Sequence, residues 1–201
     1  GGAGSAERSQ HQADIARFYE ATEPGPIYNP AARQVSAAQR RTLSQNARLF
    51  ALLNMAIFDA AIAVFDTKYF YNFWRPVTAI QSAHLDGNRK TDPDPNWQSF
   101  VYTLPFPSYP SGHAGFSGAA RRVLEHLLGA HGHAITLTNA AVPDIVLRYT
   151  SWKQIADDVD DARVFGGVHF RFEQETGQRQ GRRVGAYILR HQLRPADHRR
   201  K

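Results

Sequence analysis

Apolar residues recur at spacings of three and four along several stretches of the chain, which predicts amphipathic helices. The clearest case runs from Ser111 to about Ala130, where one apolar stripe consists of Phe116, Ala120, Val123, Leu124, Leu127 and Leu128. Similar patterns predict helices over residues 5–20, 36–65, 76–83, 151–165 and 179–193. We find no convincing alternation of apolar and polar positions. The sequence therefore predicts an all-α fold, a helical bundle with long loops.

The longest apolar stretch covers residues 49–65 and is interrupted by Asn54 and Asp59. It is too short and too polar for a membrane span, so we expect the central buried helix of a bundle. Prolines 24, 26 and 30 predict a break after the first helix, and residues 86–97 have a loop composition. We divide the chain into an N-terminal helix with a proline-rich connection (1–35), a catalytic helical bundle (36–193) and a basic tail expected to be disordered (194–201).

Composition narrows the possible chemistry. The 201 residues suffice for one domain with a real core, and the absence of cysteine excludes disulfides, thiolate catalysis and zinc–thiolate sites. A net charge of +6 favours anionic partners, but part of the excess lies in the tail and no basic stripe is present. We therefore expect no nucleic-acid partner. Composition does not decide the compartment, and a secreted or periplasmic location is only slightly favoured.

The stretch Ser111-Gly112-His113 follows a proline-rich run and stands at the start of a predicted helix. A helix N-terminus offers backbone N–H groups and the positive end of its dipole, and a glycine allows an anion to approach closely. These residues predict an oxyanion site. The alternative is that Ser111 is an ordinary helix cap and that His113 is a surface residue.

Two further stretches carry basic groups and histidine. Lys68 and Arg75 flank five aromatic residues, which we expect to exclude water; the alternative is packing at a helix end with the charges in solvent. Arg163 and His169 flank a pair of glycines. A lone histidine of this kind is often a core residue, and Arg163 could equally cap its helix.

Taken together, Lys-x6-Arg-Pro, Pro-Ser-Gly-His and Arg-x5-His resemble the three-part signature of the vanadium haloperoxidase and type 2 phosphatidic acid phosphatase superfamily. The resemblance covers about half of the chain and is strongest to bacterial vanadium haloperoxidase-like proteins. It implies that vanadate, or phosphate in the same place, is bound by Lys68, Arg75, Ser111, Gly112 and Arg163. It also implies catalytic roles for two histidines. His169 would be the axial vanadium ligand or the phosphorylated nucleophile, and His113 the acid–base group.

Two positions depart from the family's usual pattern. Ala162 stands where serine is common, and Glu173 stands where phosphatases commonly have an aspartate that orients the nucleophilic histidine. Asp160, Asp161 and Glu175 are nearby alternatives for that orienting role. Only 67 residues precede Lys68, fewer than is usual in the family. The chain therefore resembles either a compact member or part of a longer protein.

The neighbouring residues favour the peroxidase branch of the superfamily. The resemblance implies a vanadate-dependent haloperoxidase that uses hydrogen peroxide to oxidise halide to hypohalous acid, which halogenates small organic substrates. An acid phosphatase acting on phosphomonoesters is the alternative. Phe106 matches a position near the halide site in this family, although packing in the core is an equally simple role for it. A homo-oligomer is compatible with the sequence.

Overall fold

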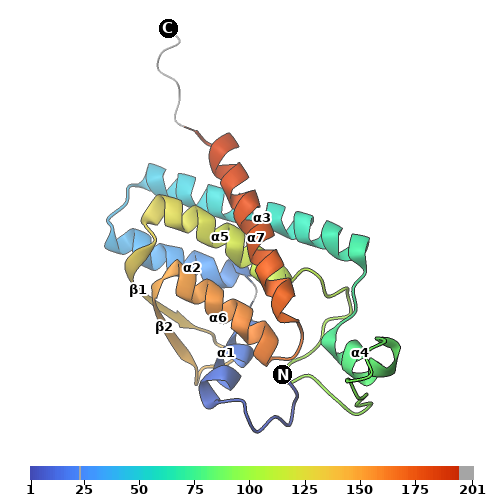
Figure 1. Cartoon of the computed structure of the whole chain (residues 1–201). Coiled ribbons are helices and arrows are strands. Elements are labelled where there is room, and N and C mark those ends of the chain that lie inside the picture. Colours follow the sequence, from blue (N-terminus) through green and yellow to red (C-terminus); the bar gives the residue numbers. More distant parts are fainter. Residues whose placement is uncertain (23, 195–201) are drawn as a thin grey trace.

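The computed structural model describes residues 1–22 and 24–194 and shows a mostly helical fold with one β-hairpin (Figure 1). The predicted helical bundle is confirmed, whereas the strictly all-α description is not. In chain order the elements are α1 (Gln10–Glu20), α2 (Pro24–Ala38), α3 (Leu43–Tyr71), α4 (Pro76–Gln81), the 3-10 turn η1 (Ala83–Leu85), α5 (Gly112–Leu128), β1 (His131–Thr138), β2 (Val146–Ser151), α6 (Trp152–Phe165) and α7 (Arg171–His191).

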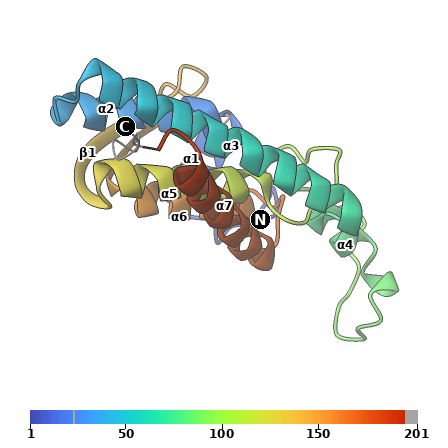
Figure 2. The same ribbon diagram turned by 90° about the horizontal axis from the view of Figure 1, so that it is seen from above.

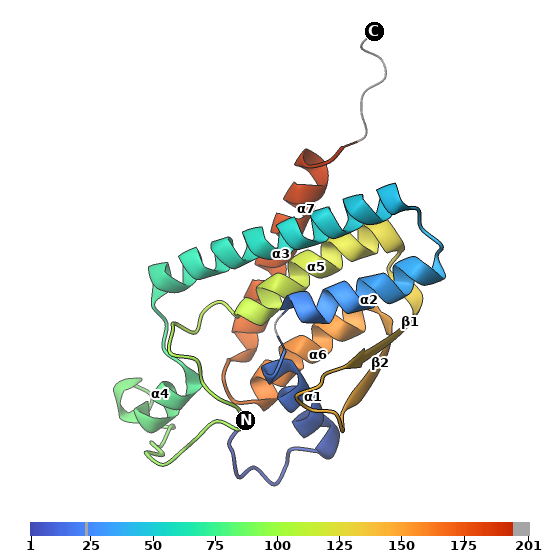
Figure 3. The same cartoon turned by 180° about the vertical axis from the view of Figure 1, so that it is seen from behind.

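Helix α5 is the centre of the bundle and packs against α2, α3, α6 and α7 (Figures 2 and 3). Small residues bring α5 and α7 together at their backbones. A Cβ on Gly181 would lie 1.8 Å from the carbonyl oxygen of Gly115, and one on Gly177 would lie 2.6 Å from that of Ser111. Close packing of this kind leaves no room for larger side chains. It holds the first turn of α5 directly against α7.

Two of the predicted helix starts are confirmed by their caps. Ser111 caps α5, where its Oγ accepts the N–H of Ala114, and Ser151 caps α6 through the N–H of Gln154. The segment from residue 86 to residue 97 contains no helix or strand, as predicted for a loop. Helix α7, in contrast, begins at Arg171 rather than near residue 179.

The proline-rich segment is itself helical, which corrects the predicted connection. Its prolines at 24 and 26 lie in the first turn of α2, where a missing N–H breaks no helical bond, and Pro30 lies inside the helix.

The predicted helix over 36–65 is divided between α2 and α3, and Thr42 caps the second. The division proposed at residue 35 lies inside α2. Side chains of α1 and α2 share the main core of the bundle. Residues 195–201 of the predicted basic tail lie outside the described residues.

The hairpin of β1 and β2 was missed by the sequence prediction. The strands pair antiparallel, with Ile135 opposite Tyr149 and Leu137 opposite Leu147. These four side chains are buried and alternate with exposed neighbours. A period of two was therefore present in both strands, but it extends over only five or so residues in each.

Helix α3 forms an outer layer of the bundle rather than its centre (Figure 2). One face packs on α5 and α7, while Phe58 and Ile62 on the other are 71% and 65% exposed. Within the described residues one segment, Leu43–Gln81, is long and apolar enough to cross a membrane by length and composition, and 33% of its apolar window is buried in the fold. The sequence-based expectation of a central buried helix was therefore wrong, since α3 buries one face only.

Candidate active site

Lys68 lies in the last turn of α3 and is completely buried. Its Nζ donates hydrogen bonds to the carbonyl oxygens of Pro107, at 2.9 Å, and Ser108, at 2.7 Å. The ammonium group therefore points into the protein and does not extend to solvent. The neighbouring aromatic residues differ from the prediction, because Tyr69 and Phe70 are exposed and exclude no water from the Lys68 side chain.

Arg75 is buried at the start of α4 and joins three segments of the chain. Its Nε donates to the carbonyl oxygen of Phe106 at 3.0 Å, and its Nη1 donates to that of Val168 at 2.9 Å. Nη1 also lies 3.1 Å from Nε2 of His169. The remaining nitrogen, Nη2, is buried and has no hydrogen-bond partner among the described residues.

The first turn of α5 presents Gly112 and His113 to the same region as Lys68. A Cβ on Gly112 would lie 4.0 Å from Cε of Lys68, so the bare glycine backbone faces the lysine. The N–H of Gly112 is the first of the helix, where no carbonyl of the same helix precedes it to accept a hydrogen bond. The Ser111 hydroxyl caps the helix, and its backbone N–H donates to the carbonyl oxygen of Glu173 at 3.1 Å.

His169 lies between α6 and α7 and is held by a carboxylate. Its Nδ1 is 2.6 Å from Oε2 of Glu173, which is itself fully buried. The same oxygen accepts a hydrogen bond from the Ser108 hydroxyl at 2.9 Å. Glu173 is therefore the orienting carboxylate, since Asp161 pairs with Arg171 and Asp160 bonds to Gln178.

Ser108 was missed by the sequence analysis. It is fully buried and lies within 3.3 Å of Nδ1 of His169. Its position inside the proline-rich run, three residues before Ser111, was the only signal available. Ala162, where the family commonly has serine, is also fully buried and packs in the main core.

A cavity of about 480 Å³ brings most of the predicted site residues together. Its polar end is lined by Lys68, Phe106, Gly112, His113, Arg163 and His169. Arg75 is not among the residues that line the cavity, but its Nη1 contacts Nε2 of His169, which is. Arg163 is buried near the C-terminus of α6, where its Nη1 is 3.5 Å from the carbonyl oxygen of Tyr19. We call this polar end the cradle.

Burial and mutual repulsion shape the charges of the cradle. Burial, reinforced by Arg75, lowers the pKa of Lys68 to about 7, and burial lowers that of Arg75 to about 10. The pKa of His169 is held well below its usual range, mainly by burial and next by the charge of Arg75. The pKa of His113 is lowered in the same way, mainly by burial and next by the charge of Arg163. Both imidazoles are therefore neutral. Since Nδ1 of His169 donates to Glu173, its Nε2 carries no proton and accepts the hydrogen bond from Nη1 of Arg75.

These residues fit a tetrahedral oxyanion. The cradle holds an excess of positive charge in a buried place and a first-turn helix N–H. Nη2 of Arg75, whose guanidinium contacts His169 of the cradle, is buried and has no hydrogen-bond partner in the described part of the chain. An anion would supply acceptors to all three groups and would relieve the repulsion among the cations. Across residues 1–22 and 24–194 there is no group of three His, Cys, Asp or Glu side chains suited to a metal cation.

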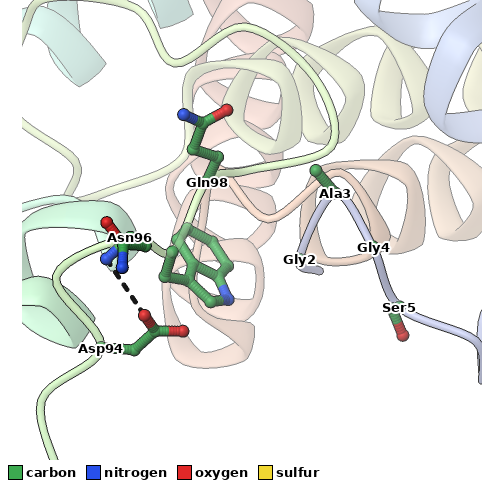
Figure 4. A pocket seen from close by; sticks show the side chains of 8 residues that line it. Gly2, Ala3, Gly4, Ser5, Asp94, Asn96 and Gln98 are labelled. Carbon is green, nitrogen blue, oxygen red and sulfur yellow. Dashed lines mark hydrogen bonds between the residues drawn. The ribbon is translucent and has the colours of Figure 1, made fainter.

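A second hollow, of about 520 Å³, shares no lining residue with the cavity of the cradle. Figure 4 shows it from close by. It is lined by residues 2–5 and by Asp94, Asn96, Trp97 and Gln98. The Asp94 carboxylate is already engaged by the N–H of Asn96 at 3.0 Å. None of the predicted site residues lines this hollow, so it is not part of the candidate site.

The fold and the cradle together describe a helical-bundle protein with a buried cluster of cationic side chains and two histidines. A comparison with family models agrees, because residues 48–198, or 151 of the 201 residues, match the VCPO second helical-bundle domain. The chain therefore belongs to this family, which confirms the resemblance to vanadium haloperoxidases.

Individual relatives support the same family. The vanadium chloroperoxidase of Curvularia inaequalis is 31% identical over 115 residues, which covers 48% of this chain and 18% of that protein. A crystal structure of a bacterial vanadium-dependent iodoperoxidase superposes with a TM-score of 0.78 at 29% identity, covering 92% of this chain and 44% of the other. A holo-type bacterial vanadium-dependent chloroperoxidase shares the fold, with a TM-score of 0.55 at 19% identity and coverage of 90% and 48%. The chain thus spans less than half the length of these relatives.

Proposed function

We propose that this chain provides the site at which a vanadate-dependent haloperoxidase oxidises halide with hydrogen peroxide. The observation that carries the proposal is the geometry of His169. Its Nδ1 is fixed by Glu173, its unprotonated Nε2 lies 3.1 Å from Nη1 of Arg75, and the residue lines the same cavity as Lys68 and Arg163. Membership of the family supports vanadate as the anion.

The basic residues bind the anion in this proposal. Lys68, Arg75 and Arg163 neutralise its oxygens, and the N–H of Gly112 donates to one of them, with Ser111 holding that turn of α5 in place. Because the pKa of Lys68 is about 7 in the free protein, the lysine is only partly charged at neutral pH. An adjacent anion would raise that pKa and make the lysine fully charged.

The two histidines have different tasks. His169 would hold the vanadate through Nε2, and Glu173 keeps the proton on Nδ1. His113 lies in the first turn of α5, neutral and at the same cavity, and exchanges a proton with the oxygen that faces it. Vanadate, when bound, supplies a Lewis acid that makes peroxide an electrophilic oxygen donor to halide.

The ring of Phe106 lies close to two of the cations. The centre of its ring is 5.3 Å from Nζ of Lys68 and 5.0 Å from Cζ of Arg75. This position supports a role for Phe106 at the halide site, where its ring would exclude water from the incoming ion. Packing over the two cations accounts for the same contacts. Iodide and chloride are named for the relatives, and the halide used by this chain is left to experiment.

Phosphomonoester hydrolysis is the second candidate. A histidine nucleophile needs a carboxylate that orients one nitrogen and a second nitrogen that carries no proton. Glu173 keeps the proton on Nδ1 of His169, so Nε2 is unprotonated; its hydrogen bond from Nη1 of Arg75 would be exchanged for contact with the substrate. In that reaction the cradle would hold the phosphoryl group of the substrate and His113 would protonate the leaving oxygen.

One preparation, freed of bound phosphate, tests the two functions in parallel. Half of it is loaded with orthovanadate and assayed for peroxide-dependent oxidation of iodide and bromide. The other half is kept free of vanadate and assayed for hydrolysis of an aryl phosphate. We expect halide oxidation that requires vanadate, with little hydrolysis. Hydrolysis that vanadate inhibits, without halide oxidation, would instead establish the phosphatase.

His169→Ala is the decisive variant, because it removes the ligand or nucleophile. It should lose both vanadate-dependent oxidation and any hydrolysis. His126→Ala is its control, since His126 is an exposed histidine of α5 that does not line the cavity. Full activity in His169→Ala would overturn the assignment of the site.

A further inference from the structure

Helix α3 lies at the edge of the bundle and is apolar on two opposite faces (Figure 3). The face toward α5 and α7 holds its buried residues, among them Leu53, Ala56 and Ala60. On the opposite face, apolar residues recur at alternating intervals of four and three, which is the heptad spacing by which one helix packs along another. We call this second stripe the outer seam: Ala51, Met55, Phe58, Ile62, Phe65 and Tyr69.

The large side chains of the outer seam are in contact with solvent. Phe58, Ile62 and Tyr69 are 71%, 65% and 65% exposed, and Met55 and Phe65 between them are partly exposed. The rings of Phe65 and Tyr69 lie 6.5 Å apart, so the stripe is continuous at this end. The three most exposed side chains present on the order of 400 Å² of mostly apolar surface, a size at which surface patches are often binding sites.

The outer seam is complementary to itself when two copies of α3 run antiparallel. With residue 60 of each copy at the two-fold axis, three kinds of layer form: Phe58 with the partner's Ile62, Met55 with the partner's Phe65, and Ala51 with the partner's Tyr69. Each layer joins a larger side chain with a smaller one, and the smallest faces a tyrosine. The helix contains neither proline nor glycine, the residues that commonly kink a helix, over its 29 residues. A second copy therefore matches the stripe along its whole length.

The residues beside the outer seam add a modest cost to this pairing. Asn54 and Ala61 flank it on one side and are uncharged. Asp59 and Asp66 flank it on the other side, and both are exposed. In an antiparallel pair these carboxylates lie along the same edge as their symmetry mates, and water and salt screen most of the repulsion. A lipid surface fits less well, since helices that lie on membranes are flanked by Lys and Arg.

We propose that the chain forms a symmetric dimer through the outer seam of α3. Residues 51–69 span about 27 Å of helix. With the side chains next to the seam, two such helices bury about 1,000 Å² in total, near the lower limit for a specific interface, so we expect micromolar association. The partner's Ile62 would then cover Phe58, which lines the cavity. The proposal concerns assembly and is independent of the reaction performed at the cradle.

Sedimentation velocity over a range of micromolar concentrations measures the association. Wild type should pass from monomer to dimer as its concentration rises. Ile62→Glu places a charge at the centre of the seam and should weaken association at least about tenfold. Phe70→Glu is the matched control, because Phe70 is 80% exposed on the same helix but lies off the stripe, and it should leave the dimer unchanged. Melting temperatures compare the folding of the two variants.

Asp59→Asn tests the interface in the opposite direction. It removes one carboxylate from the edge of the seam in each copy, so association should tighten by roughly two- to fivefold. Added salt should strengthen the wild-type dimer for the same reason. Damage to the fold cannot explain a variant that associates more tightly, so this result decides even if Ile62→Glu fails to fold.

The absence of cysteine from the chain allows the register to be tested by disulfide formation. A mixture of Ala51→Cys and Tyr69→Cys should form an intermolecular disulfide on oxidation if the helices are antiparallel. Ala51→Cys alone should not, because its two copies would lie about 27 Å apart. Crosslinking of Ala51→Cys alone and not of the mixture would mean parallel helices and would contradict the proposed pairing.

Other outcomes would rule the dimer out. One is a monomer at every concentration, and another is a dimer that Ile62→Glu and Phe70→Glu affect equally. If monomeric protein is instead captured by phosphatidylcholine vesicles, and Ile62→Glu prevents the capture, the outer seam faces lipid and not a second copy.

Discussion

Glu173, in the first turn of α7, approaches His169, four residues earlier in the chain, with Oε2 of the carboxylate 2.6 Å from Nδ1 of the imidazole. The same oxygen accepts the Ser108 hydroxyl and the N–H of Phe170, each at 2.9 Å. One carboxylate oxygen therefore caps the start of α7 and also fixes the tautomer and the direction of the histidine ring. This contact couples the folding of α7 to the chemistry of the cradle.

Replacing Glu173 with glutamine should weaken the hold of this side chain on the orientation and protonation of His169. The amide oxygen can still accept one hydrogen bond, but it carries no full charge to hold three donors. We expect vanadate affinity or turnover to fall roughly 10- to 100-fold, as for other residues that orient metal ligands. Vanadate titration and steady-state kinetics measure both quantities. Glu175→Gln is the control, because Glu175 is exposed on the same helix.

Glu173→Asp separates position from charge. The shorter side chain keeps the carboxylate but withdraws it from His169, so we expect partial loss, between that of the control and that of Glu173→Gln. If Glu173→Gln and Glu175→Gln bound vanadate equally well and turned over equally fast, an orienting role for Glu173 would be excluded.

His113 should affect turnover more than anion binding. It is neutral, because burial and then Arg163 hold its pKa well below the usual range, so it adds no charge to the cradle. His113→Asn removes the proton-transfer group, and we expect turnover to fall by roughly 100- to 10,000-fold while vanadate affinity changes little. His126→Asn serves as the control. An unchanged rate together with weakened vanadate binding would contradict this role.

Much of the cradle could be predicted because its residues lie next to sequence patterns that mark the ends of helices. The Ser111 cap and the apolar stripe after it mark where α5 begins, and that helix start places Gly112 and His113. The approach of Arg75 to His169 is a tertiary contact between residues 94 positions apart, and no spacing rule indicates it. Only the resemblance to a known family joined those stretches before the fold was seen.

Errors in the fold prediction arose where packing overrides local preference. Prolines 24, 26 and 30 indicated a break, yet two of them lie in the first turn of α2, where they cost little. Ser108 has no recognisable pattern because its role depends on Glu173, 65 residues later in the chain. The apolar run around Phe58 was taken for a core helix, since the sequence does not tell a buried face from a wall that opens to solvent.

The raised pKa of Asp160 leads us to predict that the unfolding free energy of the protein depends on pH. Burial raises the pKa of this carboxyl in the folded chain to about 8, far above its ordinary value. Between about pH 4 and pH 8 the folded chain therefore holds a proton that the unfolded chain has lost, and its stability falls as the pH rises. Asp160→Asn keeps an acceptor for Gln178 without the charge and should stabilise the protein by about 1 to 3 kcal/mol at pH 8.

Urea unfolding at pH 4 and pH 8 measures this effect. The advantage of Asp160→Asn should nearly disappear at pH 4, where the wild-type carboxyl is protonated in the folded state and partly so in the unfolded state. Asp66→Asn, at an exposed position of α3, should show no such difference between the two pH values. A constant advantage at both pH values would mean that the ionisation of Asp160 is not its source.

Substitution of Gly181 tests whether the close packing of α7 on α5 stabilises the fold and positions the residues of the cradle. A Cβ there would lie 1.8 Å from the Gly115 carbonyl oxygen and 2.9 Å from the backbone nitrogen of Ala119, so Gly181→Ala must push α7 away from α5. We expect a loss of about 1 to 3 kcal/mol in unfolding free energy, or roughly 2 to 4 °C in melting temperature for each kcal/mol. Gly4→Ala is the control, because nothing lies within 4 Å of its added Cβ. Since α7 also carries Glu173, the displaced helix should weaken vanadate binding as well. Equal melting temperatures for Gly181→Ala and Gly4→Ala would mean that the two helices are not in backbone contact.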